Sequence, residues 1–92
     1  MSKPGYSMIK AAQIAQDFFY TDFPDGEKAA ENDGLHVRDF ILIKADYINR
    51  FEDKEFSEYA WVFTFVHPIH NDHSFTFKVT NDGKISFLSR TE

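Results

Sequence analysis

The sequence predicts an α+β fold, in which one N-terminal helix packs on a four-stranded antiparallel sheet with the order of a meander. Three observations indicate this class. Apolar residues recur at spacings of three and four near the N-terminus, apolar and polar residues alternate along the second half, and short turn sequences separate the alternating runs. A chain of 92 residues has room for one core, so we expect a single domain over residues 1–92.

The helix is expected over about residues 7–20. Ser7 can serve as its N-cap, and the apolar positions that follow fall on one face: Met8, Ala11, Ala12, Ala15, Phe18 and Phe19. Residues 21–34 then bring a proline, two Asp-Gly pairs and five acidic side chains. This composition predicts a long, mobile acidic loop, with at most a short helical turn over residues 27–32.

The four strands are expected at about residues 35–50, 57–67, 73–80 and 84–89. The first is ambiguous, because residues 35–51 fit a helical period as well as an alternating one. We favour a strand there because the segment is rich in β-branched side chains, which pack well on a pleat: Val37, Ile41, Ile43 and Ile48. A charged turn over residues 51–58 then leads to the second strand, and Asn81-Asp82-Gly83 predicts a tight hairpin before the last.

Composition and charge exclude several classes of protein. The chain contains no cysteine, so disulfides and thiolate chemistry are absent, which suits the cytoplasm. A formal charge of −5 and basic residues that are spread singly argue against nucleic acid as a partner. No stretch approaches the roughly 20 apolar residues of a membrane span. We therefore expect a cytoplasmic protein that binds neither nucleic acid nor membrane.

An aromatic stripe along the second strand is the candidate binding surface. It comprises Tyr59, Trp61, Phe63 and Phe65. One helix of about fourteen residues is narrow for four strands, so part of this face could stay uncovered and contact another protein. An edge strand offers a second route, either to a partner's strand or to a homodimer. The alternative is that the stripe is simply core.

The turn before the third strand holds the densest group of metal-ligating side chains. They are His67, His70, Asp72 and His73, all within seven residues. If residues 68–72 form a loop, His67 and His73 face each other across a hairpin and could share a divalent metal such as zinc with one of the others. The alternative interpretation is a polar turn in water. No nucleophilic serine motif and no phosphate-binding glycine loop accompanies this group.

The segments Ala11-Ala12-Gln13-Ile14-Ala15 and Phe75-Thr76-Phe77-Lys78-Val79-Thr80-Asn81-Asp82-Gly83-Lys84-Ile85 resemble the PepSY-type domain. In that family an Ala-faced helix precedes a meander that closes on a strand, a turn and a short last strand. The resemblance implies the same topology, and family members are usually exported and thought to modulate peptidases. This sequence differs from the family by lacking an export signal and by carrying the long acidic segment 21–34.

These observations favour a non-enzymatic protein-binding or regulatory domain that needs no cofactor. Its partner would be another protein, and the acidic surface suits a basic one. The alternative function is a small metal- or ligand-binding protein that uses the turn from His67 to His73.

Overall fold

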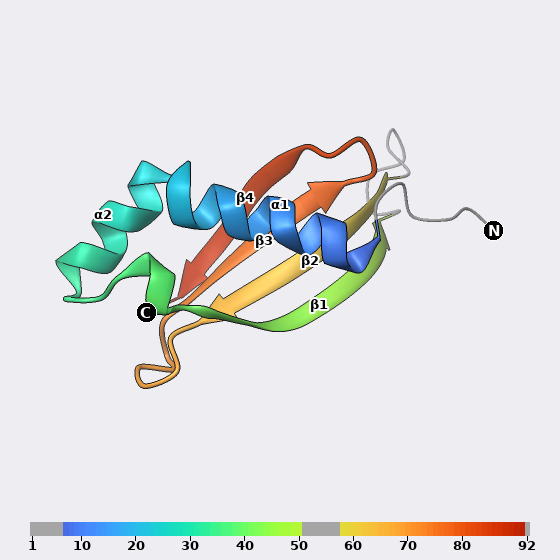
Figure 1. Cartoon of the computed structure of the whole chain (residues 1–92). Helices are drawn as coiled ribbons and strands as arrows, with labels where there is room; N and C mark the ends of the chain where they lie inside the picture. The colour runs from blue at the N-terminus through green and yellow to red at the C-terminus, as the bar shows by residue number, and fades with distance from the viewer. Residues whose placement is uncertain (1–6, 51–57, 92) are drawn as a thin grey trace.

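Two helices and a four-stranded sheet make up residues 7–50 and 58–91, the part of the chain that the structure, a computed structural model, describes (Figure 1). In chain order the elements are helix α1 (Met8–Thr21), helix α2 (Pro24–Asn32), the 3-10 helix η1 (Val37–Asp39), and strands β1 (Ile41–Arg50), β2 (Glu58–Val66), β3 (Ser74–Thr80) and β4 (Ile85–Thr91). The strand order is β1-β2-β3-β4, and each neighbouring pair is antiparallel. The predicted fold class is therefore confirmed.

Helix α1 begins at the residue that the sequence indicates. The Ser7 side chain accepts a hydrogen bond from the main-chain N–H of Lys10, with 3.2 Å between nitrogen and oxygen, and so caps the helix. Ala11, Ala15 and Phe19 are buried. Because they are four residues apart, they share one face, and the two small alanines let the helix lie close to the sheet.

The segment predicted as a loop over residues 21–34 contains a second helix, so that prediction is wrong. Helix α2 starts with Pro24, whose missing N–H is not needed at the first helical position. Asp25 and Glu27 lie in the first turn, where negative charge favours a helix. Gly34 ends the segment with φ of +75°, a backbone conformation that glycine adopts without strain. The expected helical turn over 27–32 was the C-terminal part of this helix.

The first strand begins later than predicted. Residues 35–40 form an irregular segment that contains the 3-10 helix η1 instead, and they bury Leu35, Val37 and Phe40 in the core. The strand proper starts at Ile41, which confirms strand over helix for 41–50. The turn expected between the first two strands falls mainly on residues 51–57, which lie outside the described residues.

The core lies between α1 and one face of the sheet and is mainly aromatic. Phe63, Phe65, Phe75 and Phe77 point to this face and are at most 2% exposed. Phe23, which precedes α2, covers the β3–β4 side, because its ring lies 5.6 Å from that of Phe77 and 5.1 Å from that of Phe87, centroid to centroid. In Figure 1, α1 crosses the sheet and α2 lies beside one end of it. The segment from Phe23 onward thus adds to the cover that α1 provides, and the centre of the aromatic face is buried rather than open.

Candidate functional site

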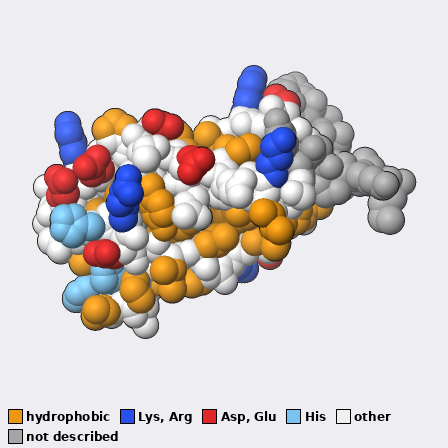
Figure 2. Space-filling view, viewed as in Figure 1, with side chains coloured by type: hydrophobic (Ala, Val, Ile, Leu, Met, Phe, Trp, Pro, Cys, Tyr) orange, Lys and Arg blue, Asp and Glu red, His pale blue; other side chains and the backbone are white. Residues whose placement is uncertain are grey.

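An open apolar groove lies between helix α1 and strand β1. It has a volume of about 450 Å³ and is lined by α1 residues between Met8 and Gln16 and by residues 42–45 of β1. Figure 2 shows hydrophobic side chains gathered between these two elements, whereas acidic side chains and histidines gather toward the end that carries α2. The groove is therefore an apolar part of the face in view.

The side chains of the groove are large and exposed. Met8, Ile9, Leu42 and Ile43 are between 37 and 68% exposed, and the neighbouring Ile41 is 50% exposed. Single exposed apolar residues are ordinary on protein surfaces, but adjacent ones from two elements form a contiguous patch. Patches of this kind are typical of contact surfaces.

The groove adjoins an unpaired edge of the sheet. Among residues 7–50 and 58–91, strand β1 pairs only with β2, so within this part of the chain the main-chain N–H and C=O groups of its outer edge have no strand partner. A bulge lies between Leu42 and Lys44 and inserts Ile43 as an extra residue. Bulges at sheet edges change the direction of a side chain, and here Ile43 lines the groove beside Leu42. The site thus combines hydrogen-bonding groups with an apolar surface.

The opposite edge, β4, is less suited to contact. It is 7 residues long against 10 for β1. Its exposed apolar residues are Phe87 and Leu88, and the Phe87 ring already packs against Phe23 and Phe77. The other side chains from position 86 to 91 are serine, arginine and threonine. We therefore place the candidate site at β1.

Two of the four aromatic residues predicted to bind a partner are buried in the core. Phe63 and Phe65 have no exposed area, so they cannot contact another protein, and this part of the prediction is wrong. Trp61 is half-buried and packs against Tyr47 of β1, with ring centroids 5.0 Å apart. Tyr59 belongs to β2, but its side chain lies outside the described residues.

The turn from His67 to His73 is held together by hydrogen bonds within the chain. His67 is 6% exposed, and its Nδ1 accepts the main-chain N–H groups of Ile69 at 3.2 Å and of His70 at 3.0 Å. The N–H of His67 donates to the carbonyl of His73 at 3.2 Å, which confirms the expected cross-strand position of these two residues. His67 therefore orders the turn, and its Nδ1 is already engaged.

The other members of the predicted metal set do not complete a site. His70 lies 6.4 Å from His73, ring centroid to ring centroid. His73 Nδ1 instead lies 3.6 Å from a carboxylate oxygen of Asp33, and its Nε2 lies 4.0 Å from one of Asp72. Within the described ranges 7–50 and 58–91, no three histidine, aspartate or glutamate side chains are arranged to hold a metal ion. The geometry gives no support to a zinc centre at this turn.

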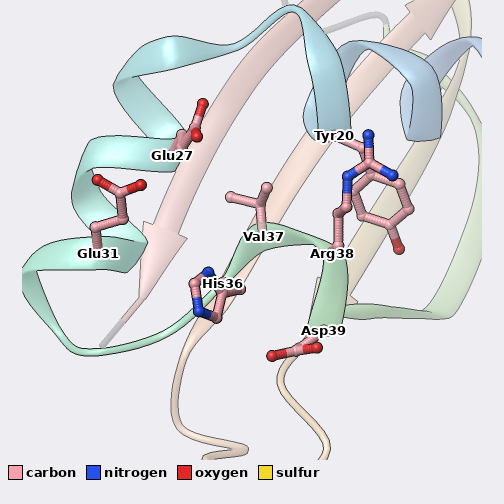
Figure 3. A pocket seen from close by; sticks show the side chains of 7 residues that line it. All are labelled: Tyr20, Glu27, Glu31, His36, Val37, Arg38 and Asp39. Atoms are coloured by element: carbon pink, nitrogen blue, oxygen red, sulfur yellow. The ribbon is translucent and has the colours of Figure 1, made fainter.

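A polar cavity of about 280 Å³ lies between the end of α1, helix α2 and η1 (Figure 3). Glu27 and Glu31 extend into it from α2, and His36 and Asp39 come from the opposite side. The carboxylates point in different directions and do not converge on one position. The cavity therefore has the character of a solvated surface hollow.

Tyr20 lines this cavity and makes the stability of the fold sensitive to alkaline pH. Its hydroxyl donates to the main-chain carbonyl of Phe40 at 2.5 Å, and burial raises the pKa of the phenol, an effect that Arg38 partly offsets. As the pH rises past about 10, the unfolded chain loses this proton before the folded chain does, so the free energy of unfolding falls.

We expect Tyr20→Phe to lower the free energy of unfolding by about 1 kcal/mol at neutral pH, because one hydrogen bond is lost. The same variant should lose less stability than the parent between about pH 9 and about pH 11, because the titrating group is gone. Urea unfolding across this range measures both effects. Equal losses in the two proteins would show that Tyr20 does not titrate differently on folding.

Comparisons with known proteins found no match, so the site is interpreted from its own geometry. No model of a protein family matches the chain, and neither a curated protein nor a solved structure matches it. Among the described residues, neither helix is long and apolar enough to cross a membrane. The resemblance to the PepSY-type domain therefore stays a prediction.

The groove residues were not predicted as a site from the sequence, although two signals were present. Ile9 falls outside the run of spacings that defines the buried face of α1. Ile41, Leu42 and Ile43 are three consecutive apolar residues, which breaks the alternation of a half-buried strand. Such a run forces at least one large apolar side chain toward solvent or into a bulge.

Proposed function

We propose that this chain is a protein-binding domain that receives an extended segment of a partner chain at the outer edge of β1, over the groove between α1 and β1. One observation carries the proposal: exposed apolar side chains of α1 and β1 form a contiguous surface directly beside an unpaired sheet edge. The aromatic face of the sheet takes no part, because its central residues are buried.

Strand addition accounts for both properties of the site. A partner strand would satisfy the unpaired main-chain groups of β1, and this contact supplies affinity that depends little on sequence. Alternate side chains of the added strand would enter the groove beside Met8, Leu42 and Ile43, which supplies specificity. The acidic character of the chain favours approach of a segment that carries basic residues among its apolar ones.

Backbone-amide chemical shifts of the full chain, titrated with synthetic peptides, test this function. The peptides would be about ten residues long, the length of a strand, with alternating apolar and polar positions and either basic or acidic polar residues. We expect at least one series to bind and to shift amides within residues 8–16 and 41–48, with the basic series binding more tightly.

Two variants that each introduce a lysine distinguish binding at β1 from binding at β4. Ile43→Lys places a charge in the groove and should weaken peptide binding at least ten-fold, a factor worth about 1.4 kcal/mol. Leu88→Lys makes the same kind of change at an exposed residue of β4 and should leave binding unchanged. Shifts that map to β4, or no binding by any peptide of either series at concentrations where the chain is monomeric, would contradict the proposed function.

A further inference from the structure

Strand β1 carries a charge pattern that complements itself. Lys44 and Asp46 are both exposed, and Lys44 Nζ lies 3.6 Å from Asp46 Oδ2 in the same chain. They pair with Thr64 and Val62 of β2, two residues apart, so both lie on the sheet face away from α1. Ala45, between them, pairs with Phe63 and lines the groove on the α1 side. A positive and a negative side chain thus flank Ala45 at equal distance along the strand.

Symmetry limits how two copies of β1 can pair edge to edge. Most homodimers have a twofold axis, and the contact then involves the same surface on both copies. If both α1 helices lie on the same side of the joined sheets, two residues that face each other across the contact must both point toward α1 or both point away from it. The twofold axis then lies midway between the two copies of one residue. An axis at Lys44 places two lysines opposite each other, and one at Asp46 places two aspartates opposite each other. An axis at Ala45 places Lys44 opposite Asp46 of the second copy, twice.

We infer that the segment received at the β1 edge is β1 of a second copy of this chain, paired antiparallel about Ala45. This inference rests on the proposed function and names its partner. The register forms two opposite-charge cross-strand pairs on one face, each of a kind that stabilises a sheet. It also brings the groove of each copy to the same seam, so that the exposed apolar residues Met8, Ile9 and Leu42 can be covered there.

The bulge limits the length of this pairing. Because Ile43 is an extra residue, the regular part of β1 runs from Lys44 onward, and main-chain pairing about Ala45 stays short. A short pairing with a fixed charge register favours a closed dimer over open-ended addition of strands. The apolar groove then supplies the rest of the contact.

A charge-exchange experiment on the full chain tests the register. Sedimentation equilibrium should give a concentration-dependent mass that rises from 10.7 kDa to twice that value. In a dimer of Lys44→Glu, a glutamate faces Asp46 of the other copy twice, and in a dimer of Asp46→Lys, a lysine faces Lys44 of the other copy twice. Because like charges repel, each variant alone should dimerise at least ten-fold more weakly. An equimolar mixture of the two variants should recover the dimer, because each introduced charge then meets its opposite in the other chain. Lys28→Glu, an exposed charge reversal on α2, is the matched control and should dimerise as the parent does.

Several results would overturn the inference. A mass of 10.7 kDa at every concentration up to about 1 mM would exclude the dimer, because a dissociation constant of about 1 mM corresponds to a binding free energy of only about 4 kcal/mol. A dimer that both charge variants leave intact, or that their mixture fails to restore, would exclude the register about Ala45. If the chain stays monomeric while peptides still bind at β1, the inference fails and the proposed function stands. If no peptide binds and no dimer forms, both fail.

Discussion

Replacing Phe19 with alanine should lower the free energy of unfolding by about 3–5 kcal/mol, which is the typical cost of removing a buried phenylalanine. Phe19 is 1% exposed and is the central ring of the core. Five other rings surround it, with centroid distances from 4.8 to 5.6 Å: Tyr20, Phe40, Phe65, Phe75 and Phe77. The free energy of unfolding of a whole domain is about 5–15 kcal/mol, so this loss is a large fraction of the total.

Urea unfolding of the variant and of a control on the same helix measures this effect. Ile9→Ala removes a side chain of α1 that is 68% exposed, so its free energy of unfolding should change by no more than about 0.5 kcal/mol. Similar losses for Phe19→Ala and Ile9→Ala would mean that α1 does not insert Phe19 between the rings of the sheet.

Replacing Gly26 with alanine should destabilise the protein by about 1–3 kcal/mol, the usual range for overpacking. In most helices this change stabilises, because alanine restricts the unfolded chain and favours the helix. Here a methyl group at position 26 would lie 2.5 Å and 2.7 Å from two ring carbons of Phe23. That ring packs between Phe18 and Phe87 and has little room to move.

A second background isolates the contact with Phe23. In Phe23→Leu the ring is absent, so adding Gly26→Ala should cost much less and can become stabilising by about 0.5 kcal/mol. Thermal or urea unfolding of the four proteins gives the coupling energy between the two positions. Additive effects would contradict the close packing of Gly26 on the Phe23 ring.

The sequence was sufficient to predict the architecture because the elements of the sheet have strong local signals. Alternation from Trp61 to Val66 and from Ser74 to Thr80 predicts β2 and β3, and Asn81-Asp82-Gly83 predicts their connection to β4. The N-cap Ser7, followed by apolar residues at spacings of three and four, likewise predicts α1. Each of these signals is contained within one element, so no knowledge of packing is needed to read it.

Helix α2 was missed because its residues are individually typical of turns. Pro24 and Gly26 break helices in most contexts, but here the proline stands at the first position and the glycine is needed for contact with Phe23. That contact joins residues whose relation depends on the tertiary fold. The same holds for the groove, because Met8 and Ile43 line one surface only when α1 packs beside β1 in the folded chain (Figure 1).

The histidine turn shows a different case, in which the sequence left both a metal site and a polar turn open and the fold uses His67 for structure. His67 is buried against Phe40, with 5.4 Å between ring centroids, and binds the main chain of its own turn. Sequence spacing alone does not distinguish a histidine whose nitrogen is free from one that accepts main-chain hydrogen bonds. The burial of His67 decides between these two cases.

Amide hydrogen exchange of the full chain at low and high concentration tests the central claim most directly, because it compares the two sheet edges in one measurement. At concentrations where the dimer forms, we predict that outward-facing amides of β1 around Ala45 become protected while those of β4 continue to exchange rapidly. Protection of β4, or equal exchange of both edges at every concentration, would contradict the assignment of β1 as the contact surface between copies.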